Sequence, residues 1–301
     1  MTISRAQLAK ELEPGLNALF GLEYDRYEDE AAEIFESESS DRAFEEEVML
    51  SGFGTAPVKS EGSAINFDNA QETYTARYTM ETIALAFSIT EEAVEDNLYD
   101  SLAKRYTRAL ARSMSQTKQI KGATIMNNAF STTSPIGDGA ALCSAAHPSL
   151  SGNQTNLLAT PADLNETSLE EILIQIAGFT DERGLKIAVR GTKLLIPKEL
   201  QFIAERIINS NLRPGSADND INAMKSMGML PEGAVVNHFF TDADAYFVKT
   251  DCPNGFKLFN RTPLKTAMEG DFDTGNMRFK ARERYSFGVS DWRCVFGTPG
   301  A

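Results

Sequence analysis

Histidine and cysteine, two residue types that often carry out chemistry, are scarce in this sequence. The histidines are His147 and His238, and the cysteines are Cys143, Cys252 and Cys294, which lie far apart. Cys143 and His147 approach a zinc-binding spacing, but zinc needs three or four ligands and no second pair lies nearby. A buried thiol and a loop histidine explain them more simply. Separated cysteines in odd number indicate a reducing compartment rather than a disulfide framework.

A different chemistry is suggested by Ser115 and Lys118, which have the SxxK spacing of some serine hydrolases. The SDN and KTG companions of that pattern are missing, and so is a GxSxG turn. Both residues fall in a long helical pattern, where serine and lysine are ordinary surface residues. A soluble hydrolase that uses Ser115 and Lys118 is therefore kept only as an alternative.

Other candidate motifs are equally weak. No glycine-rich phosphate-binding motif occurs, and Asp242 and Asp244, a possible carboxylate pair, lie between two apolar runs as in a turn. Asn153 and Asn165 open glycosylation sequons, which have no meaning in a cytosol-like space. We predict no catalytic, cofactor-binding or metal-binding residues, and hence no enzyme.

Charge and hydropathy exclude further classes. The chain has 301 residues with 29 basic and 43 acidic side chains, a net charge of −14. A strong binder of nucleic acid or anionic membranes would have the opposite balance. The start of the chain lacks the apolar stretch of a signal peptide, and the longest apolar run, residues 83–87, is too short to span a bilayer.

Most of the negative charge belongs to an acidic N-terminal arm, residues 1–50, which holds fourteen acids and four bases. Large apolar residues are scattered within it: Tyr24, Tyr27, Ile34, Phe35 and Phe44. The arm is too acidic to pack as a core helix but has enough apolar groups to need a surface. We predict either local disorder or docking onto a neighbouring subunit.

An extended β-hairpin is predicted over residues 51–90, because apolar and polar residues alternate there. The apolar phase switches near Glu81 and Thr82, so a bulge, a twist or a strand end falls at that point. Such a ribbon has few apolar residues at its tip and cannot bury itself. We therefore expect it to pack on another chain.

A long helix is predicted next, over residues 91–121. Ser88 and Glu91 have the spacing of a capping box. One stripe follows the helical period: Val94, Leu98, Leu102, Tyr106, Ala109, Leu110, Met114, Thr117 and Ile120. The helix would span about 46 Å at 1.5 Å per residue, long enough to form a spine across the subunit.

After a loop-rich stretch, residues 131–165, the pattern becomes a mixed α/β subdomain at 166–250. A helix follows Thr167 and Ser168, strands are predicted at 185–189, 193–196, 235–240 and 246–248, and Pro197 opens a second helix. The remaining residues are β-rich, with a short strand at 256–259 and a long one over 277–289 that has a kink at Gly288.

Basic residues occupy one face of that long strand: Arg278, Lys280, Arg282 and Arg284. Three alternatives stay open: a solvated face, salt bridges to the acidic arm or to another subunit, and nucleic-acid binding. Glu283, Glu269, Asp271 and Asp273 are available as acidic partners, which weighs against a phosphate-binding stripe.

The order of these parts resembles that of tailed-bacteriophage major capsid (major head) proteins. Residues 138–148 (DGAALCSAAHP) and 152–158 (GNQTNLL) are similar to a stretch of the Mu-like major head subunit family, except that Cys143 replaces a frequent phenylalanine and Thr155 a frequent serine. Residues 190–197 (RGTKLLIP) and 284–292 (RYSFGVSDW) also resemble family segments. The resemblance covers roughly residues 50–301.

This resemblance implies an α+β tailed-phage capsid shell fold without cofactors or catalytic residues. Its parts would be an N-terminal arm (1–50), an extended β-ribbon loop (51–90), a peripheral domain with the spine helix (91–165 and 251–301) and an axial α/β domain (166–250). The ribbon would overlap a neighbouring subunit, and the arm would reach another.

The implied function is that of a shell subunit. Hexameric and pentameric capsomers would form an icosahedral shell around double-stranded DNA, without sequence-specific DNA binding or membrane contact. Portal, scaffold and decoration proteins would be the partners, with assembly in the host bacterial cytoplasm and a final location in the virion. An encapsulin-like cargo nanocompartment shares the fold and remains the nearer alternative.

Overall fold

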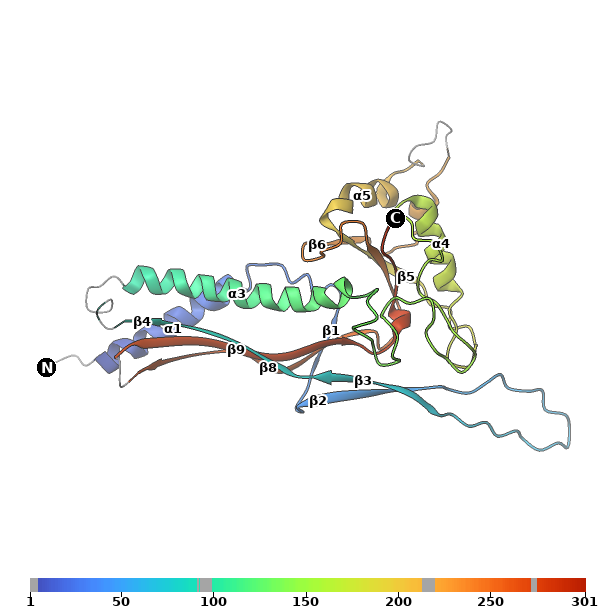
Figure 1. Cartoon of the computed structure of the whole chain (residues 1–301), viewed down its shortest axis with the longest axis horizontal. Coiled ribbons are helices and arrows are strands. Elements are labelled where there is room, and N and C mark those ends of the chain that lie inside the picture. Colours follow the sequence, from blue (N-terminus) through green and yellow to red (C-terminus); the bar gives the residue numbers. More distant parts are fainter. Residues whose placement is uncertain (1–4, 91, 93–98, 213–219, 272–274) are drawn as a thin grey trace.

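The computed structural model describes residues 5–90, 92, 99–212, 220–271 and 275–301, which form two units and a projecting ribbon (Figure 1). The first unit is long and narrow, with two helices lying along one face of a β-sheet. The second unit is an α/β fold at one end of the first. The ribbon runs past the second unit on the side of the sheet away from the helices.

The sheet of the first unit has the strand order β1-β8-β9-β4. Its strands are β1 (Glu36–Ser39), β4 (Glu81–Ile89), β8 (Phe256–Gly270) and β9 (Met277–Val289). The predicted alternation along β9 is confirmed, since Phe279, Ala281 and Tyr285 are buried. Helices α1 (Arg5–Tyr24) and α3 (Tyr99–Asn127) cover this apolar face. The strand predicted to be short, 256–259, is only the beginning of β8.

The predicted spine helix is present as α3, although it continues past the predicted end at residue 121. Its 29 residues span about 44 Å at 1.5 Å per residue. The predicted capping residue Glu91 lies outside the described residues. The apolar stripe is wrong at Ala109, which is exposed, and at Tyr106 and Ile120, which are 50 % and 52 % exposed. The polar residues Thr107 and Gln119 are buried instead. Gln119 is buried because it hydrogen-bonds the N-terminal segment described below.

The ribbon differs from its predicted range, 51–90. Its two strands are β2 (Phe44–Leu50) and β3 (Glu72–Thr79), which pair antiparallel, and the residues between them form no strand. Strand β4 belongs to the sheet of the first unit, where it pairs with β9. The predicted strand end near Glu81 is confirmed, because β3 ends at Thr79 and β4 begins at Glu81.

The acidic N-terminal segment packs on its own chain, which corrects the prediction that it needs a neighbouring subunit or is disordered. Leu16 and Phe20 of α1 and then Ile34 and Phe35 are at most 6 % exposed. Strand β1 follows and pairs parallel with β8, and β2 completes the ribbon. The described part of the arm is therefore a structural part of both the sheet and the ribbon.

The second unit has a sheet of order β10-β7-β5-β6. Its elements are α4 (Glu166–Ala177), β5 (Gly191–Pro197), α5 (Gln201–Asn209), α6 (Ala223–Met227), β6 (Ala234–Asn237), β7 (Tyr246–Thr250) and β10 (Val295–Thr298). The cap of α4 is Asn165, which exchanges hydrogen bonds with Ser168. The strand predicted at 185–189 is wrong, since Thr180 and Lys186 form one isolated bridge there.

The end of the chain belongs to the second unit, not to the first as the predicted range 251–301 implied. Strand β10 pairs with β7, and Trp292 and Phe296 are completely buried in the core of the α/β unit. A separate apolar cluster joins the two units, because it contains Phe35 and Tyr285 from the first together with Leu195 and Phe247 from the second. The units thus share a continuous core.

Candidate assembly surfaces

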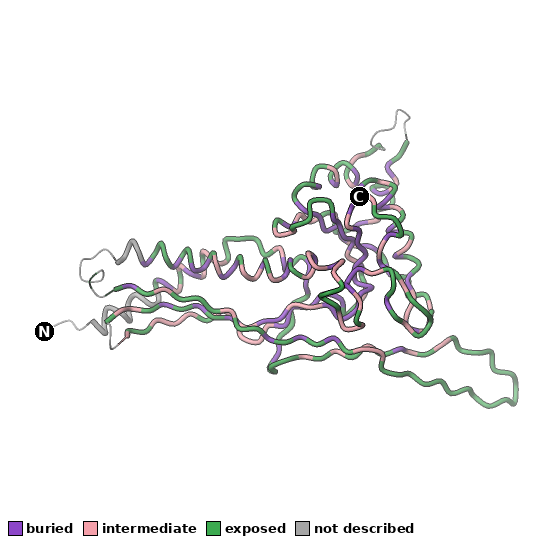
Figure 2. Tube along the Cα trace, viewed as in Figure 1, coloured by how far each residue is buried: buried purple, intermediate pink, exposed green. Residues whose placement is uncertain are grey.

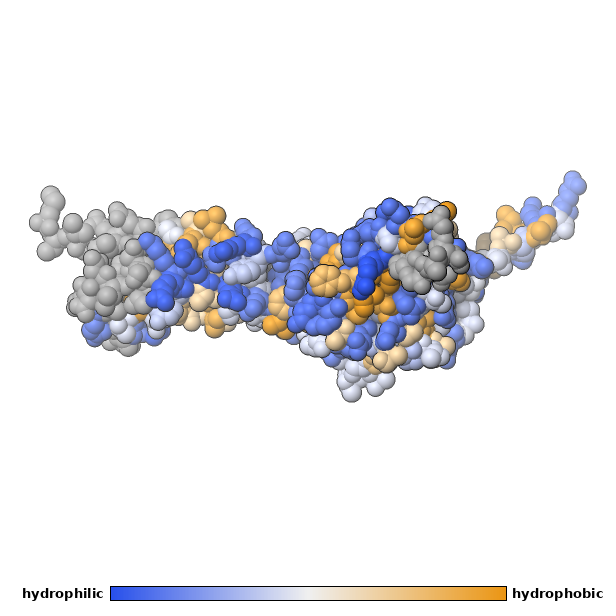
Figure 3. Space-filling view, turned by 90° about the horizontal axis from the view of Figure 1, so that it is seen from above, coloured by the Kyte–Doolittle hydropathy of each residue, from blue (hydrophilic) through white to orange (hydrophobic). Residues whose placement is uncertain are grey.

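The ribbon loop, residues 51–71, is the most exposed apolar segment of the described chain (Figure 2). Phe53, Val58, Ile65 and Phe67 are 62 %, 98 %, 70 % and 97 % exposed. Figure 3, which views the molecule from above, shows hydrophobic side chains on the projecting end. Apolar groups so far from any core mark a surface that another molecule covers.

Buried polar groups hold the base of the ribbon. The hydroxyl of Tyr78 (β3) and the carboxylate of Glu47 (β2) both hydrogen-bond the Ser290 hydroxyl. Glu47 also binds Lys257 of β8, which is 5 % exposed and lies 3.1 Å from Glu38. Burial alone would lower the pKa of Lys257, but its hydrogen bonds to Glu47 and Glu38 raise it above the usual value. The ribbon is therefore fixed at its base and free at its tip.

The packing of Tyr78 against β9 also explains why residue 288 is a glycine. A Cβ at this position would collide with the ring of Tyr78, so only glycine lets β3 cross β9 this closely. The predicted kink is thus a site of close packing, and it sets where the ribbon leaves the sheet.

Residues 25–41, which we call the strap, connect the first unit to the second. On the side of the first unit, Asp29 accepts a 2.8 Å hydrogen bond from Gln119 and lies 3.2 Å from Lys118 Nζ. The backbone amide of Ala31 donates to Gln119 Oε1 at 2.8 Å. Gly122 permits this approach, because a Cβ there would lie 3.1 Å from the Cβ of Ala31.

The strap contacts the second unit through side-chain and backbone oxygens of Glu30, Glu33 and Ile34. Glu30 binds His238 at 2.7 Å, and Glu33 binds Lys193 at 2.8 Å. The backbone oxygens of Glu33 and Ile34 accept from Lys193 at 3.2 Å and from Lys249 at 2.9 Å. Lys193 is 7 % exposed and also binds Glu232 at 3.0 Å. The acidity of this segment therefore matches lysines that the body of the molecule presents.

The motif stretch at 138–158 forms a buried cluster where the two units meet. His147 is completely buried between Asp138 Oδ2 at 2.6 Å and Asn156 Oδ1 at 3.0 Å, and its ring stacks on Trp292 at 4.3 Å. The Asn156 amide donates to the backbone oxygens of Leu142, Trp292 and Val295 at 2.8–3.2 Å. These bonds join the motif stretch to itself and to the segment that leads into β10, so the cluster organises structure.

Glu283, predicted as an available acidic partner for the basic face of β9, is a buried carboxyl. It lies on the opposite, buried face and is 5 % exposed. The hydroxyl of Tyr24 donates to it at 3.4 Å. Burial is the main cause that raises the pKa of Glu283 to about 7, against a partly opposing effect of Lys118.

The basic face of β9 remains exposed. Arg278, Lys280 and Arg282 face outward, and Arg278 binds Asp271 at 2.5 Å. Among the acids of the arm, Glu33 pairs with Lys193, and Glu38 and Glu47 pair with Lys257, instead of with this face. Salt bridges to a second subunit remain a prediction.

The remaining candidate residues are not brought together for catalysis. Ser115 is 6 % exposed on the packed side of α3, and the ammonium of Lys118 binds Asp29. Cys143 and Cys294 are buried, and Cys252 is partly buried; all three are free thiols. Asp242 accepts from the backbone amides of Asp244 and Ala245, which confirms the predicted turn. The described residues hold no group of three metal-ligating side chains, and no described helix could span a membrane.

The fold combines two units joined by a shared apolar cluster with a projecting ribbon whose loop exposes apolar side chains. A family model described as phage capsid protein matches residues 73–297. The chain belongs to this phage capsid protein family, and it is a structural component of a phage capsid. No curated protein sequence matches it significantly.

Solved structures of shell proteins have the same fold at low sequence identity. The capsid of an empty GTA particle is 13 % identical with a TM-score of 0.55, covering 92 % of this chain and 91 % of that one. The capsid of Myoviridae phage XM1 is 11 % identical with a TM-score of 0.53, covering 89 % of each chain. A virus-like particle from Pyrococcus furiosus is 8 % identical with a TM-score of 0.54, covering 94 % and 97 %.

Proposed function

We propose that this chain is the major capsid subunit of a tailed phage and assembles into hexameric and pentameric capsomers of an icosahedral shell around double-stranded DNA. The observation that carries the proposal is the ribbon, whose base is fixed by buried polar groups while its apolar loop is exposed. A monomer gains nothing by exposing these side chains, whereas a repeated subunit buries every copy of them.

The two units would have different places in a capsomer. The first unit, with α3 as its spine, would be the peripheral domain, and the second the axial domain that faces the capsomer centre. The exposed apolar residues of the second unit support such contacts: Ile174, Phe202, Ile221 and Met227 are 71–73 % exposed. The Mu-like subgroup remains part of this proposal and rests on the motif stretch at 138–158.

The partners follow from a shell of this kind. We expect a portal protein at one vertex, with scaffold and decoration proteins as further partners, and assembly in the cytoplasm of the host bacterium. The net charge of −14 supports enclosure of DNA without sequence-specific binding, since a strongly basic wall would grip the genome.

Electron microscopy of the purified chain, with light scattering on the same sample, tests the proposal. Closed particles, pentamers or hexamers are expected. A species that stays monomeric or dimeric across salt and protein concentration, even with the neighbouring head proteins co-expressed, would contradict it. Nuclease-protected DNA in particles from infected cells distinguishes a genome container from a cargo nanocompartment, which would hold an enzyme and no genome.

A further inference from the structure

The outer face of helix α3 carries a row of positive charge. Residues 101–127 of this helix include six basic and no acidic residues, although acids outnumber bases by 43 to 29 in the whole chain. Arg105, Arg108 and Arg112 are exposed and have the spacing i, i+3, i+7, which places them on one side of the helix. We call these three residues the arginine row. The row extends over about 10.5 Å at 1.5 Å per residue.

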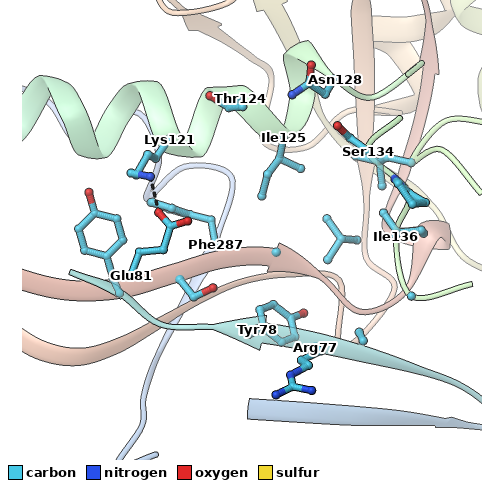
Figure 4. A pocket seen from close by; sticks show the side chains of 18 of the residues that line it. Arg77, Tyr78, Glu81, Lys121, Thr124, Ile125, Asn128, Ser134, Ile136 and Phe287 are labelled. Carbon is cyan, nitrogen blue, oxygen red and sulfur yellow. Dashed lines mark hydrogen bonds and ion pairs between the residues drawn. The ribbon is translucent and has the colours of Figure 1, made fainter. Parts of the chain in front are cut away.

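The arginine row differs from two lysines further along α3, which have acidic partners. Lys118 binds Asp29 at 3.2 Å, and Lys121 forms an ion pair with Glu81 (Figure 4). By contrast, no hydrogen bond or ion pair holds the three guanidinium groups in the part of the chain that the structure describes. Like charges three and four residues apart in a helix repel one another. The row therefore costs the fold stability, which indicates that its charges serve a partner.

The surface beside the arginine row offers further hydrogen-bond donors. An open hollow of about 310 Å³ lies between α3 and the end of α1, and two arginines of the row line it together with Ser113 and Gln116. Glu23, the one acid of its described lining, already binds Arg26 at 3.5 Å. Guanidinium, hydroxyl and amide groups are those with which proteins bind the phosphates of nucleic acids. The chemistry of this face thus suits a phosphate backbone.

An acidic polypeptide would also neutralise the arginine row, but two observations favour DNA. Tyr27 and Ala109 are the only apolar or aromatic residues of the described lining of the hollow, whereas the centre of a protein interface is mostly apolar. In addition, the exposed apolar loop that we assign to contacts between chains projects on the other side of the sheet (Figure 1). The helical side therefore stays open to a partner of a different kind.

We propose that the arginine row of α3 binds phosphate groups of duplex DNA, independently of the DNA sequence. This inference rests on the proposed function, in which the shell encloses double-stranded DNA. The duplex carries one negative charge per about 1.7 Å of its axis, so the row meets phosphates wherever DNA lies against it. Three arginines in each subunit give a weak, salt-sensitive contact, which agrees with a net charge of −14 on the chain.

Binding of a short fluorescent duplex to the purified chain, kept below the concentration at which it assembles, tests this site. The triple variant Arg105→Gln, Arg108→Gln and Arg112→Gln should bind the duplex more weakly. It should also lower the slope of the logarithm of the association constant against the logarithm of salt concentration by about 2.7, since each phosphate contact contributes about 0.9. Because these side chains are exposed and unpaired in the described structure, the variant should unfold at no lower denaturant concentration than the wild type.

The matched control removes the same charge from the opposite face of the sheet. Lys265→Gln, Lys280→Gln and Arg282→Gln change three exposed residues, and this variant should bind the duplex like the wild type. Equal losses in the two triple variants would mean that net charge alone governs binding, and would overturn the proposal. Tighter binding of poly-glutamate than of the duplex would make the row a protein-docking site and would overturn it as well.

The same experiment separates this inference from the proposed function. Shells that form from a wild-type chain whose subunits do not bind the duplex would overturn the inference and leave the shell function intact. Failure of the wild-type chain to assemble would instead contradict the proposed function.

Discussion

Single buried polar residues decide how this subunit responds to pH and substitution. Glu283 lies among Tyr24, Tyr285, Asp29 and Lys118, and its hydrogen bond to Tyr24 ties α1 to the sheet. A carboxyl in such a place is more stable protonated, because burial penalises the charged form. The connection between α1 and the sheet is therefore sensitive to pH.

The sign of this pH dependence follows from linkage. The folded-state pKa of Glu283 is about 7 and the usual value is 4.5, so the folded state holds the extra proton between them. The free energy of unfolding should fall as pH rises through this window. Glu283→Gln should therefore raise stability at pH 8 by on the order of 1–3 kcal/mol relative to the wild type. Urea unfolding of both proteins at a series of pH values measures this difference in the free energy of unfolding.

The control for this experiment is Glu269→Gln, an exposed carboxyl on β8. Its pH profile should match that of the wild type. If Glu283→Gln left the slope between pH 4.5 and 7 unchanged, Glu283 would not be the group that titrates there.

Asn156 has the largest number of structural contacts in the motif cluster. Replacing it with alanine removes the donor to three backbone oxygens and the acceptor that faces His147. Because these groups are buried, Asn156→Ala should lower the free energy of unfolding by about 3 kcal/mol. Asn153→Ala, in the exposed part of the same loop, should change it little, and chemical denaturation of both compares them. Equal stabilities would show that the cluster is dispensable.

At the scale of elements, periodicity predicted most of the regular structure and little of the strap. The alternation in β9 and the helical spacing of α3 are local patterns, so their existence could be inferred from sequence. The packing of the strap could not be inferred, because the two buried residues Ile34 and Phe35 lie in a segment with twelve acids between Glu23 and Glu47 and form no periodic pattern. The lysines that bind the strap, Lys193 at Glu33 and Lys249 at the backbone oxygen of Ile34, lie more than 150 residues away along the chain, and no local signal connects them.

Two predicted domain boundaries were wrong for a related reason. Strand β2 was assigned to the acidic arm because three consecutive glutamates conceal its alternation, and its pairing with β3 is not visible in either segment alone. The last strand, β10, was separated from the α/β unit because it follows β9 directly in sequence, although its hydrogen bonds go to β7.

The strap should be essential for folding, and the loss of stability on substituting Phe35 tests this prediction. Its ring packs edge-on against Phe256 and Phe287 at 5.4 Å and 4.8 Å. Phe35→Ala should destabilise the subunit by about 3–5 kcal/mol through cavity formation. Phe53→Ala, the same substitution on a ring that is 62 % exposed, should change stability by no more than about 0.5 kcal/mol. Equal effects in thermal unfolding would contradict a role for the strap in the core.

At the scale of the whole molecule, folding and assembly use different parts of the chain. The two units share an apolar cluster, the ion pair of Glu33 with the buried Lys193 connects the strap to the second unit, and that of Glu47 with the buried Lys257 fixes the ribbon base to β8. The ribbon loop contributes to none of the core clusters of the described residues, and its attachments to the body lie near its ends, where Arg183 binds Asp68 and Asn69. Removing the loop should therefore separate assembly from folding.

Replacing residues 55–67 with a short glycine–serine link provides that test. The strands β2 and β3, the Gly54–Asp68 hydrogen bond and the Arg183 contacts are all retained, so the variant should match the wild type in circular dichroism and in its unfolding midpoint. It should nevertheless yield soluble subunits or isolated capsomers rather than shells in electron microscopy, because the exposed apolar loop residues supply contacts only between chains. Closed shells from this variant would mean that the exposed faces of the two units suffice for assembly, and the ribbon would then serve another purpose.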